Sequence, residues 1–381
     1  MILKDYLNSK PLYYSEIDYT RMPRIYEKLK SSLTTPKTVH IIGTNGKGTT
    51  GRFLANALCS MGVKVGHYTS PHILEFNERV WLKGANATDA EIEDAHIELQ
   101  KLLTPFDSDS LSYFEYTTLL GMIVFKKCDY VVMEAGLGGE FDATAVFAKC
   151  LTLVTPIGHD HEAFLGSSIN SIATTKLNAI QNSAILATQN YEEVYKIADK
   201  LMAEKSLNIK KVSEFIDEKD REKIEQIAKN LSLVPYLIDN LSLSIAALNF
   251  LGLKYEIENF SSAPLFGRVT KISDNIIIDV GHNSLAASGI VEALNAQKFT
   301  LIYNSYRDKN YKEILSILKP IILDVEIIEV DNQRVEELQK IEKALDDLGI
   351  KHTIFKEIKE EQSYLVFGSF SVVEAFLRSY A

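Results

Sequence analysis

The residues best suited to chemistry form one glycine-rich stretch, Gly43-Thr44-Asn45-Gly46-Lys47-Gly48-Thr49-Thr50. It follows an apolar, strand-like run at residues 39–42 and precedes a helical pattern at residues 52–58. Glycines permit positive φ angles and close backbone approach, so successive N–H groups and the helix N-terminus can converge on a polyphosphate. The stretch therefore predicts a phosphate-binding loop. The alternative is a glycine-rich strand-to-helix turn without a ligand.

Within such a loop the polar side chains have distinct expected tasks. Lys47 is placed to contact the β- and γ-phosphates of a nucleotide, and Thr49 or Thr50 to bind Mg²⁺. The spacing departs from the usual pattern of this loop, because Gly48 separates the lysine from the first threonine. We predict Thr49 as the metal-binding hydroxyl, with Thr50 as the alternative.

Two more polar residues stand at the ends of predicted strands. Ser70 follows an alternating strand pattern at residues 63–68, and Glu134 ends the apolar run at residues 130–134. The carboxyl ends of strands are where ligands bind in open α/β sheets. A lone carboxylate there, in a chain with a phosphate loop, is typical of an NTPase Mg²⁺ site, and the alternative is a solvated strand end.

A histidine-containing loop is the next candidate. His159, Asp160 and His161 follow the strand predicted at residues 151–155. A single loop histidine is usually structural or exposed, but two histidines with an aspartate at the carboxyl end of a strand favour a ligand site. We therefore predict His161 as a second Mg²⁺ or phosphate contact.

Strands that alternate with helices must position these residues, which predicts an α/β protein with a mainly parallel sheet. Apolar patterns predict helices at residues 116–126 and 171–177, and the second of these carries Lys176. Residues 240–248 predict a buried helix whose first residue, Asn240, is either its N-cap or a ligand contact. The aromatic residues near position 113 are either core or the wall of a binding site.

The end of the chain predicts a second domain. Strand patterns at residues 276–279, 299–303, 325–330 and 364–367 alternate with helices and predict a smaller parallel α/β domain. We place the junction in residues 259–266, which are rich in Ser, Ala and Pro. A lead-in helix and loop are expected in residues 1–35, and a length of 381 residues fits two or three domains.

Composition excludes several classes of protein. With 46% apolar and 24% charged residues the chain has ordinary globular composition, and no apolar run is long enough to cross a bilayer. A formal charge of −10 without a basic stripe argues against a nucleic-acid binder. The N-terminus lacks a signal-peptide pattern, so we expect a cytoplasmic protein. Cys59, Cys128 and Cys150 lack metal-ligand spacing and are expected to be core residues.

Taken together, these motifs resemble a known family. The loop at residues 43–49 resembles the nucleotide loop of the Mur-type ATP-dependent amide ligases. Further stretches look like the dihydrofolate synthase/folylpolyglutamate synthase branch, and the match spans nearly the whole chain. These stretches are Ser70-Pro71-His72, Asn77-Glu78-Arg79, Tyr113-Phe114-Glu115-Tyr116-Thr117, residues 134–144, Phe266-Gly267-Arg268, residues 279–283, Arg307-Asp308-Lys309 and Gly368-Ser369-Phe370.

The resemblance implies an ATP-binding, Mur ligase-type central domain over residues 1–262, a Rossmann-like C-terminal Mur ligase-type α/β domain over residues 263–381, and an active site in the cleft between them. It implies catalytic roles for Lys47, Lys176, Arg268 and His282. It implies nucleotide contacts by Asn45, Gly46, Lys47, Gly48, Thr49, Asn240, Arg268 and Asp279, and Mg²⁺ ligation by Ser70, Glu134, His161 and Thr49. It implies a substrate wall of Ser112, Tyr113, Phe114, Glu115, Phe141, Asp142 and Ala143.

Lys176 matches a lysine that is carbamylated in many members of this family, which would make it a ligand of a second Mg²⁺. The chain also departs from the family pattern. Glu140 stands where arginine is usual, Ala145 where asparagine is usual, and Thr175 and Asn178 where glutamate and glycine are usual. A His-Gln pair usual before the buried helix is not evident.

The activity implied by the resemblance is ATP-dependent ligation of L-glutamate to 7,8-dihydropteroate through an acyl phosphate, with further glutamates added to tetrahydrofolates. The expected partners are these small molecules, without nucleic acid or membrane, and the expected state is a monomer. A dedicated folylpolyglutamate synthase and another Mur-type ligase are the nearest alternatives. A non-catalytic nucleotide-binding protein is the alternative from another class.

Overall fold

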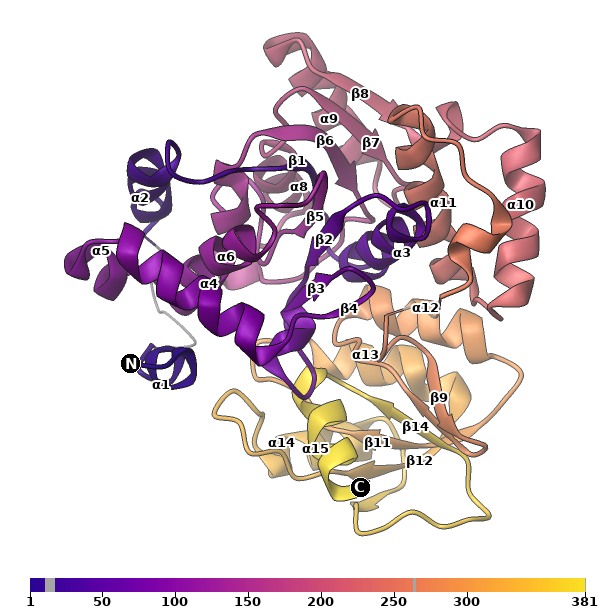
Figure 1. Ribbon diagram of the computed structural model, residues 1–381. Helices are drawn as coiled ribbons and strands as arrows, with labels where there is room; N and C mark the ends of the chain where they lie inside the picture. Colours follow the sequence, from indigo (N-terminus) through magenta and orange to yellow (C-terminus); the bar gives the residue numbers. More distant parts are fainter. Residues whose placement is uncertain (11–17, 263–264, 381) are drawn as a thin grey trace.

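The strand-forming runs of the first part of the chain lie side by side in one sheet (Figure 1), with eight strands among the residues that the structure describes. This computed structural model describes residues 1–10, 18–262 and 265–380. In spatial order the strands are β4 (Ala85–Asn86), β3 (Val80–Leu82), β2 (Val65–Tyr68), β5 (Tyr130–Glu134), β1 (Lys37–Ile42), β6 (Lys149–Val154), β7 (Ser183–Leu186) and β8 (Asn208–Lys211). Pairs from β2 to β8 are parallel, while β3 and β4 add an antiparallel edge. The loops after β1, β2, β5 and β6 therefore leave the sheet at one edge.

Helices bury both faces of this sheet. Successive side chains of its central strands point to opposite faces, so one strand contributes apolar residues to both. Val39 and Ile41 of β1 pack with the helices on one face, and Ile42 packs with those on the other. The first face is covered by α3 (Lys47–Ser60), α10 (Glu218–Asn230) and α11 (Pro235–Phe250). The second face is covered by α4 (Asp89–Leu102), α6 (Tyr113–Val124), α8 (Ile169–Leu177) and α9 (Glu192–Lys205).

Shorter helices complete this part of the chain. They are α1 (Leu3–Asn8), α2 (Arg21–Leu29), α5 (Pro105–Ser110), α7 (Glu162–Leu165) and the 3₁₀ helices η1 (Phe76–Arg79), η2 (Ala143–Val146), η3 (Val212–Glu214) and η4 (Ile257–Phe260). The helix expected in the lead-in segment is confirmed as α2, and residues 11–17 of that segment lie outside the described residues.

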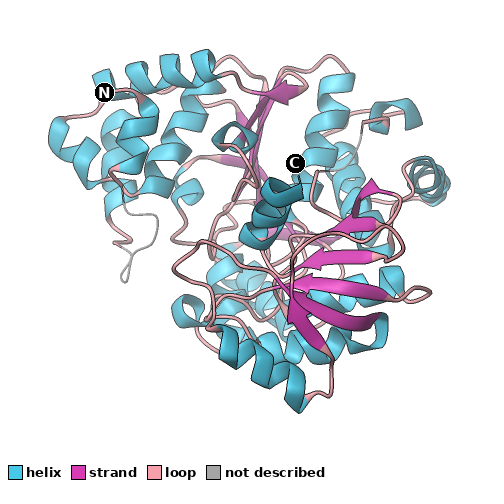
Figure 2. Cartoon of the chain, turned by 90° about the horizontal axis from the view of Figure 1, so that it is seen from below, coloured by secondary structure: helices cyan, strands magenta, loops and turns pink. Residues whose placement is uncertain are grey.

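A second sheet is formed by the end of the chain, as predicted, and has six strands within the described ranges. Its spatial order is β13 (His352–Ile354), β12 (Ile322–Ile327), β11 (Phe299–Tyr303), β14 (Tyr364–Phe367), β10 (Ile276–Ile278) and β9 (Thr270–Ser273). All pairs are parallel except β9 with β10, an antiparallel edge that departs from the predicted parallel sheet. Figure 2 shows helices on both sides of this sheet.

Alternation along β11 decides which helices cover which face. Leu301 and Tyr303 pack with α12 (Ser284–Leu294), α13 (Tyr311–Leu318) and α14 (Leu338–Asp347), and the 3₁₀ helix η5 (Lys319–Ile321) directly follows α13. Ile302 packs on the opposite face with α15 (Phe370–Tyr380). The loops after β10, β11 and β14 leave this sheet together at its carboxyl edge.

Two helices begin earlier than predicted because hydroxyl side chains cap them. Ser112 accepts a hydrogen bond from the N–H of Glu115 and starts α6, which was expected only from residue 116. Ser168 accepts one from the N–H of Ser171 and starts α8. Such caps satisfy N–H groups that the helix itself leaves unpaired.

The strands of the first sheet fall within residues 37–211 and those of the second within residues 270–367. The predicted division between residues 262 and 263 stays a prediction, since residues 263–264 lie outside the described residues. Among the helices that the structure describes, none is both long and apolar enough to cross a bilayer.

The position of β2 depends on a glycine, and this gives a test of the packing. A Cβ atom at Gly66 would lie 2.6 Å from a ring carbon of Phe125, within overlapping distance. Gly66→Ala is therefore expected to lower the free energy of unfolding by about 1–3 kcal/mol through overpacking. Denaturant titration measures this loss. Gly158→Ala is the control, because its Cβ would meet Leu285 at 3.4 Å, an ordinary contact, and equal losses for both variants would contradict the packing argument.

Candidate functional site

The predicted phosphate loop connects the central strand β1 to α3. Gly46 has φ 88° and directly precedes the helix, a conformation that favours glycine. The Lys47 ammonium donates to the Thr44 carbonyl oxygen at 3.1 Å and lies 3.9 Å from Glu134 Oε1. The loop thus gathers a lysine, a carboxylate and a helix N-terminus at the carboxyl edge of the sheet.

Glu134 reaches the loop because β5 pairs with β1 and places Glu134 opposite Ile41. Its Oε2 accepts hydrogen bonds from the Thr69 hydroxyl and from the Ser70 N–H at 3.2 Å. Glu134 and the segment after β2 are therefore adjacent, as the sequence predicted from their places at strand ends.

Several buried polar atoms near the loop have no partner, which tests whether the residues fit a magnesium nucleotide. They are Thr49 Oγ1, Thr50 Oγ1 and Asn240 Nδ2. A Cβ atom at Gly46 would overlap the Asn240 side chain, 3.1 Å from its Cγ, so glycine leaves the backbone open beside this amide. Unsatisfied donors and acceptors beside open backbone are what a polyphosphate and its cation can occupy.

The N-cap alternative for Asn240 is wrong. The helix α11 begins at Pro235, five residues earlier than the start expected at residue 240, because proline fits the first turn of a helix. Asn240 lies inside α11, 4% exposed, with its side chain against the loop.

Among the residues that the structure describes, no three His, Cys, Asp or Glu side chains converge as a metal site. Mg²⁺ is commonly held by one or two carboxylates together with phosphate oxygens, so Glu134 beside a phosphate loop suits that chemistry. The hydroxyls of Thr49 and Thr50 are both buried without a partner, so each has a lone pair available to a metal ion.

Lys176 projects from α8 to the start of the loop. Its ammonium group donates to the Gly43 carbonyl oxygen at 2.8 Å, and its side chain is buried. Burial, together with the charge of Lys47, lowers the pKa of Lys176 to about 7. A substantial fraction of the amine is therefore neutral near pH 7.

His161 lies in the loop after β6 with φ 52°. Burial lowers the pKa of His161 to about 3, despite the opposing charge of Asp160. Its imidazole is therefore neutral at physiological pH, the form in which histidine binds metals.

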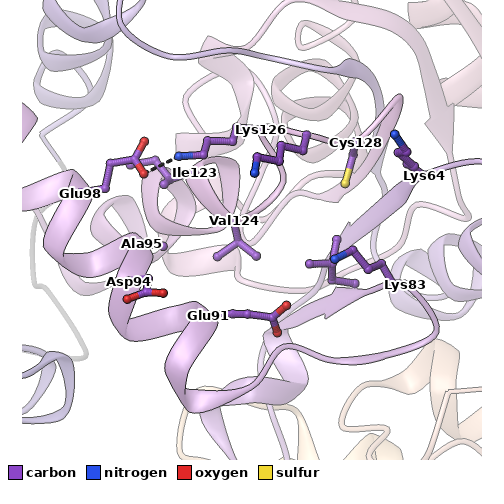
Figure 3. A pocket seen from close by; sticks show the side chains of 12 residues that line it. Lys64, Lys83, Glu91, Asp94, Ala95, Glu98, Ile123, Val124, Lys126 and Cys128 are labelled. Atoms are coloured by element: carbon purple, nitrogen blue, oxygen red, sulfur yellow. Dashed lines mark hydrogen bonds and ion pairs between the residues drawn. The ribbon is translucent and has the colours of Figure 1, made fainter.

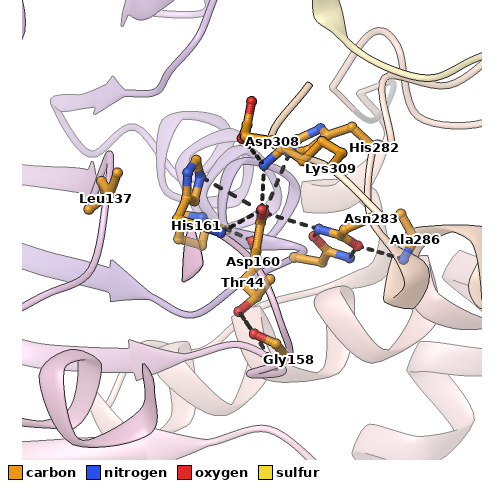
Figure 4. A network of polar contacts seen from close by, with 12 residues as sticks. Thr44, Leu137, Gly158, Asp160, His161, His282, Asn283, Ala286, Asp308 and Lys309 are labelled. Carbon is orange, nitrogen blue, oxygen red and sulfur yellow. Dashed lines mark hydrogen bonds and ion pairs between the residues drawn. The ribbon is translucent and has the colours of Figure 1, made fainter. Parts of the chain in front are cut away.

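Asp160 lies at the centre of a polar network that joins the two parts of the chain (Figure 4). Burial alone would raise the pKa of Asp160, but His282, His161 and Lys309 hold it well below its usual range. Its Oδ2 lies 3.5 Å from His282 Nε2 and accepts from Asn283 Nδ2 at 3.2 Å. Its Oδ1 accepts from Lys309.

Of the predicted residues of the C-terminal part, His282 and Asp279 contact the first part of the chain, through Asp160 and Tyr236. His282 is oriented by a 3.1 Å contact between its Nδ1 and the Val280 carbonyl oxygen. The Asp279 carboxylate is buried and accepts from the N–H groups of Val269 and Gly281. Arg268 lies over the Phe370 ring at 5.3 Å and donates to the Gly267 carbonyl oxygen at 3.1 Å.

The predicted substrate wall at the start of α6 has structural partners. Ser112 and Glu115 form a capping box, and Glu115 also accepts from Arg21 Nε at 2.7 Å. Tyr113 lies under the Arg79 guanidinium at 5.4 Å. The Phe114 ring fills the space where a Cβ at Gly136 would lie.

The second stretch of the predicted wall, residues 141–143, follows the glycines after β5. Asp142 is buried and accepts from the N–H groups of Leu137 and Thr144, and Ala143 is buried beside it. Phe141 is 51% exposed and lies 4.7 Å from the Tyr19 ring, measured between ring centroids. Phe141 is therefore the residue of this stretch most accessible to a ligand.

Four residues that join the two parts were not assigned roles from the sequence. Asp160, Asn283 and Lys309 belong to motifs at residues 159–161, 279–283 and 307–309, and their polar residue types were the sequence signal for a role. Tyr236 gave no signal, yet its hydroxyl donates to Asp279 Oδ2 at 2.9 Å. Contacts between distant segments are not visible in local patterns.

A surface pocket of about 550 Å³ lies elsewhere, between α4, the end of α6 and the β3–β4 hairpin (Figure 3). Its lining mixes cations and anions with a few apolar residues: Lys64, Leu82, Lys83, Glu91, Asp94, Ala95, Glu98, Ile123, Val124, Lys126, Lys127 and Cys128. None of the predicted site residues is among them, so this pocket is separate from the phosphate loop.

Known proteins resemble this chain over most of its length. A dihydrofolate synthase/folylpolyglutamate synthase of Buchnera aphidicola subsp. Baizongia pistaciae is 30% identical over 365 residues, covering 87% of this chain and 83% of the relative. The crystal structure of Helicobacter pylori folylpolyglutamate synthetase is 39% identical with a TM-score of 0.79, covering 99% of this chain and 97% of that one. E. coli FolC in complex with DHPP and ADP is 27% identical with a TM-score of 0.82, covering 98% and 96%. No protein-family model matches the sequence.

The unpaired hydroxyl of Thr49 gives a test that separates binding from stability. Thr49→Val is expected to leave the free energy of unfolding unchanged or raised, since the lost hydroxyl has no partner, but to abolish the thermal stabilisation by magnesium ADP. Thr117→Val is the matched control. Its hydroxyl lies 3.0 Å from the Tyr68 hydroxyl, so the free energy of unfolding of this variant is expected to fall by about 1 kcal/mol. Its thermal stabilisation by magnesium ADP is expected to stay the same. A Thr49→Val protein with the full nucleotide response would remove Thr49 from the metal site.

Proposed function

The chain belongs to the dihydrofolate synthase/folylpolyglutamate synthase family, and on that premise we propose that it is an ATP-dependent ligase that joins L-glutamate to 7,8-dihydropteroate and adds further glutamates to reduced folates. The observation that supports this function most strongly is that a phosphate loop meets residues from both sheets. Lys47 lies beside Glu134, and Asn45 exchanges hydrogen bonds with Asn283. An acid, an amine and a nucleotide can be brought together where two domains meet.

We assign the nucleotide to the loop and its neighbours. The proposed contacts are Asn45, Gly46, Lys47, Gly48, Thr49, Asn240, Arg268 and Asp279, and the proposed Mg²⁺ ligands are Ser70, Glu134, His161 and Thr49. Mg²⁺, when bound, neutralises charge on the phosphate oxygens. The neutral imidazole of His161 and the Glu134 carboxylate beside Lys47 support this assignment.

In the proposed reaction the carboxylate of dihydropteroate attacks the γ-phosphorus of ATP, giving an acyl phosphate and ADP. The glutamate amine then attacks the acyl carbon, forming the amide and releasing phosphate and a proton. Lys47, Arg268 and His282 stabilise the negative charge that develops. The domain interface excludes water, which would otherwise hydrolyse the acyl phosphate.

We assign the pterin-bearing substrate to Ser112, Tyr113, Phe114, Glu115, Phe141, Asp142 and Ala143. The half-exposed Phe141 supports this assignment, because a flat heterocycle stacks well on an aromatic ring. Ser112, Glu115 and Asp142 hydrogen-bond to backbone N–H groups, so we assign them the role of fixing the backbone of the substrate wall.

We propose that Lys176 is carbamylated in the active enzyme and binds a second Mg²⁺. Carbamylation joins the neutral amine to carbon dioxide, forms an N–C bond and releases a proton. A pKa of about 7 supplies the neutral amine at physiological pH. The product is an anion, which relieves the repulsion between Lys176 and Lys47.

Lys176→Ala is therefore expected to lose most ligase activity and to regain part of it when short-chain carboxylates are added, because they restore an anion beside the loop. ADP release with saturating substrates measures both effects. Lys149→Ala is the control, since Lys149 is also buried, with a pKa lowered by burial to about 8, but it donates to the carbonyl oxygens of Ala145 and Ala179. Full activity of Lys176→Ala, or equal rescue of both variants, would contradict carbamylation.

A second candidate is a dedicated folylpolyglutamate synthase, which the name of the Helicobacter pylori relative favours. Glu140 favours the first candidate. It adds an acid near the proposed wall, and Asn178 holds its carboxylate by a 2.8 Å hydrogen bond. A fixed anion disfavours a second substrate carboxylate, which glutamylated folates have and dihydropteroate lacks.

We therefore expect a higher rate with dihydropteroate than with tetrahydrofolate in parallel assays with ATP and L-glutamate. The assay follows ADP release and product mass, and Lys47→Ala is the control that should abolish turnover with either acid. Glu140→Arg is expected to raise the tetrahydrofolate rate relative to dihydropteroate. Product from tetrahydrofolate alone would support the dedicated synthase, and turnover that needs neither acid nor glutamate would exclude both candidates.

A further inference from the structure

Asp160 is a buried carboxylate whose partners come from both parts of the chain. From its own part, the His161 N–H donates to Asp160 Oδ1 at 2.9 Å. From the C-terminal part, Lys309 donates to the same oxygen, while Asn283 and His282 face Oδ2 at 3.2 Å and 3.5 Å. The side chains of Asp160 and Lys309 are 6% and 4% exposed.

These contacts surround the carboxylate on both oxygens. An ionised carboxylate has about four lone-pair directions. Asp160 Oδ1 accepts two hydrogen bonds, while Oδ2 accepts one and faces the His282 imidazole. A substrate or metal ion would have to displace one of these partners to reach it. Asp160 is therefore suited to act through its neighbours and not on a reacting atom.

The network continues from Asp160 to the phosphate loop. Asn283 also exchanges two hydrogen bonds with the Asn45 side chain, each 2.9 Å long. Its Oδ1 further accepts from the Ala286 N–H and caps α12. One asparagine thus connects Asp160, the phosphate loop and the first turn of a C-terminal helix (Figure 4).

We propose that Asp160 is a positioning residue for ligation: it fixes Lys309, His282 and Asn283 of the C-terminal part against the phosphate loop. This inference rests on the proposed function. A buried ion pair adds little stability compared with an apolar pair, but removing one partner leaves the other charge uncompensated. Its main effect is geometric, because Lys309, Asn283 and His282 of the C-terminal part all meet one carboxylate, which specifies one orientation of the two sheets.

The consequence is a loss of rate when Asp160 is neutralised. Asp160→Asn keeps the size of the side chain but replaces one acceptor by a donor that faces Lys309 or His282. Displacing catalytic groups by about 1 Å can lower a rate about 100-fold. We expect a decrease of about that size in kcat, with a KM for ATP within about threefold of wild type, because protein groups surround the Asp160 carboxylate and a positioning residue acts through them.

The experiment measures steady-state kinetics of ligation and the radius of gyration by small-angle X-ray scattering with magnesium ADP. The variants are Asp160→Asn, Lys309→Gln and the double variant, with Asp160→Glu as the conservative change. We expect the double variant to lose no more than the stronger single variant, Asp160→Glu to regain part of the rate, and Asp160→Asn to be less compact than wild type.

Asp107→Asn is the matched control. Asp107 is likewise a buried carboxylate paired with cations, Lys28 at 2.7 Å and Arg24 at 3.0 Å, but all three lie in α2 and α5 of the first part of the chain. It is expected to lose stability with unchanged kcat and compactness. If Asp160→Asn does not fold, Asn283→Ser replaces it, because serine keeps the helix cap and loses both amide links.

Three results would overturn the proposal. One is a kcat for Asp160→Asn equal to that of Asp107→Asn. Another is a large rise in the KM for ATP without a change in compactness, which would make Asp160 a direct ligand. The third is additive losses in the double variant. Failure of the proposed function is distinct, since wild-type protein would then show no glutamate-dependent turnover, while the scattering comparison would still test the contact.

Discussion

The candidate site depends on one close approach of the backbone. At Gly43, where β1 ends, a Cβ atom would lie 2.8 Å from the Thr155 carbonyl oxygen, and φ is 137°. Only glycine meets both conditions without strain. This contact presses the phosphate loop against the end of β6, where Lys176 donates to the Gly43 carbonyl and Asp160 follows five residues after Thr155. Lys176 and Asp160 lie close to the phosphate loop because the chain can turn at Gly43.

Several ionisable side chains near the phosphate loop are buried. Lys176, Asp160 and Lys309 are all buried, and a buried charge is tolerated only with partners or with a shifted pKa. Lys176 has a lowered pKa, whereas Asp160 and Lys309 form an ion pair between the two parts of the chain. Cationic and anionic groups are thus concentrated where a nucleotide with its cation would add further charge of both signs.

Several residues of the proposed substrate wall also maintain the fold. Ser112 and Glu115 cap α6, and Asp142 holds the glycine-rich segment after β5 through backbone N–H groups. Their types would be required by the local structure even without a ligand. The Phe141 ring is half-exposed, so a change at this position is expected to disturb the fold less than a change at Ser112, Glu115 or Asp142.

The sequence by itself determined the local features: the phosphate loop, Glu134 at the end of a strand, the histidine-containing loop of His161, the α/β class and the family. These depend on neighbouring residues, on periodicity and on glycine, all of which are visible in one dimension. Tertiary structure alone decided that Asp160 pairs with Lys309, that Asn283 reaches Asn45, and that Asn240 lies inside a helix against Gly46. These contacts join residues more than a hundred positions apart, and their geometry is set by how the two sheets and their helices pack, which no local pattern encodes.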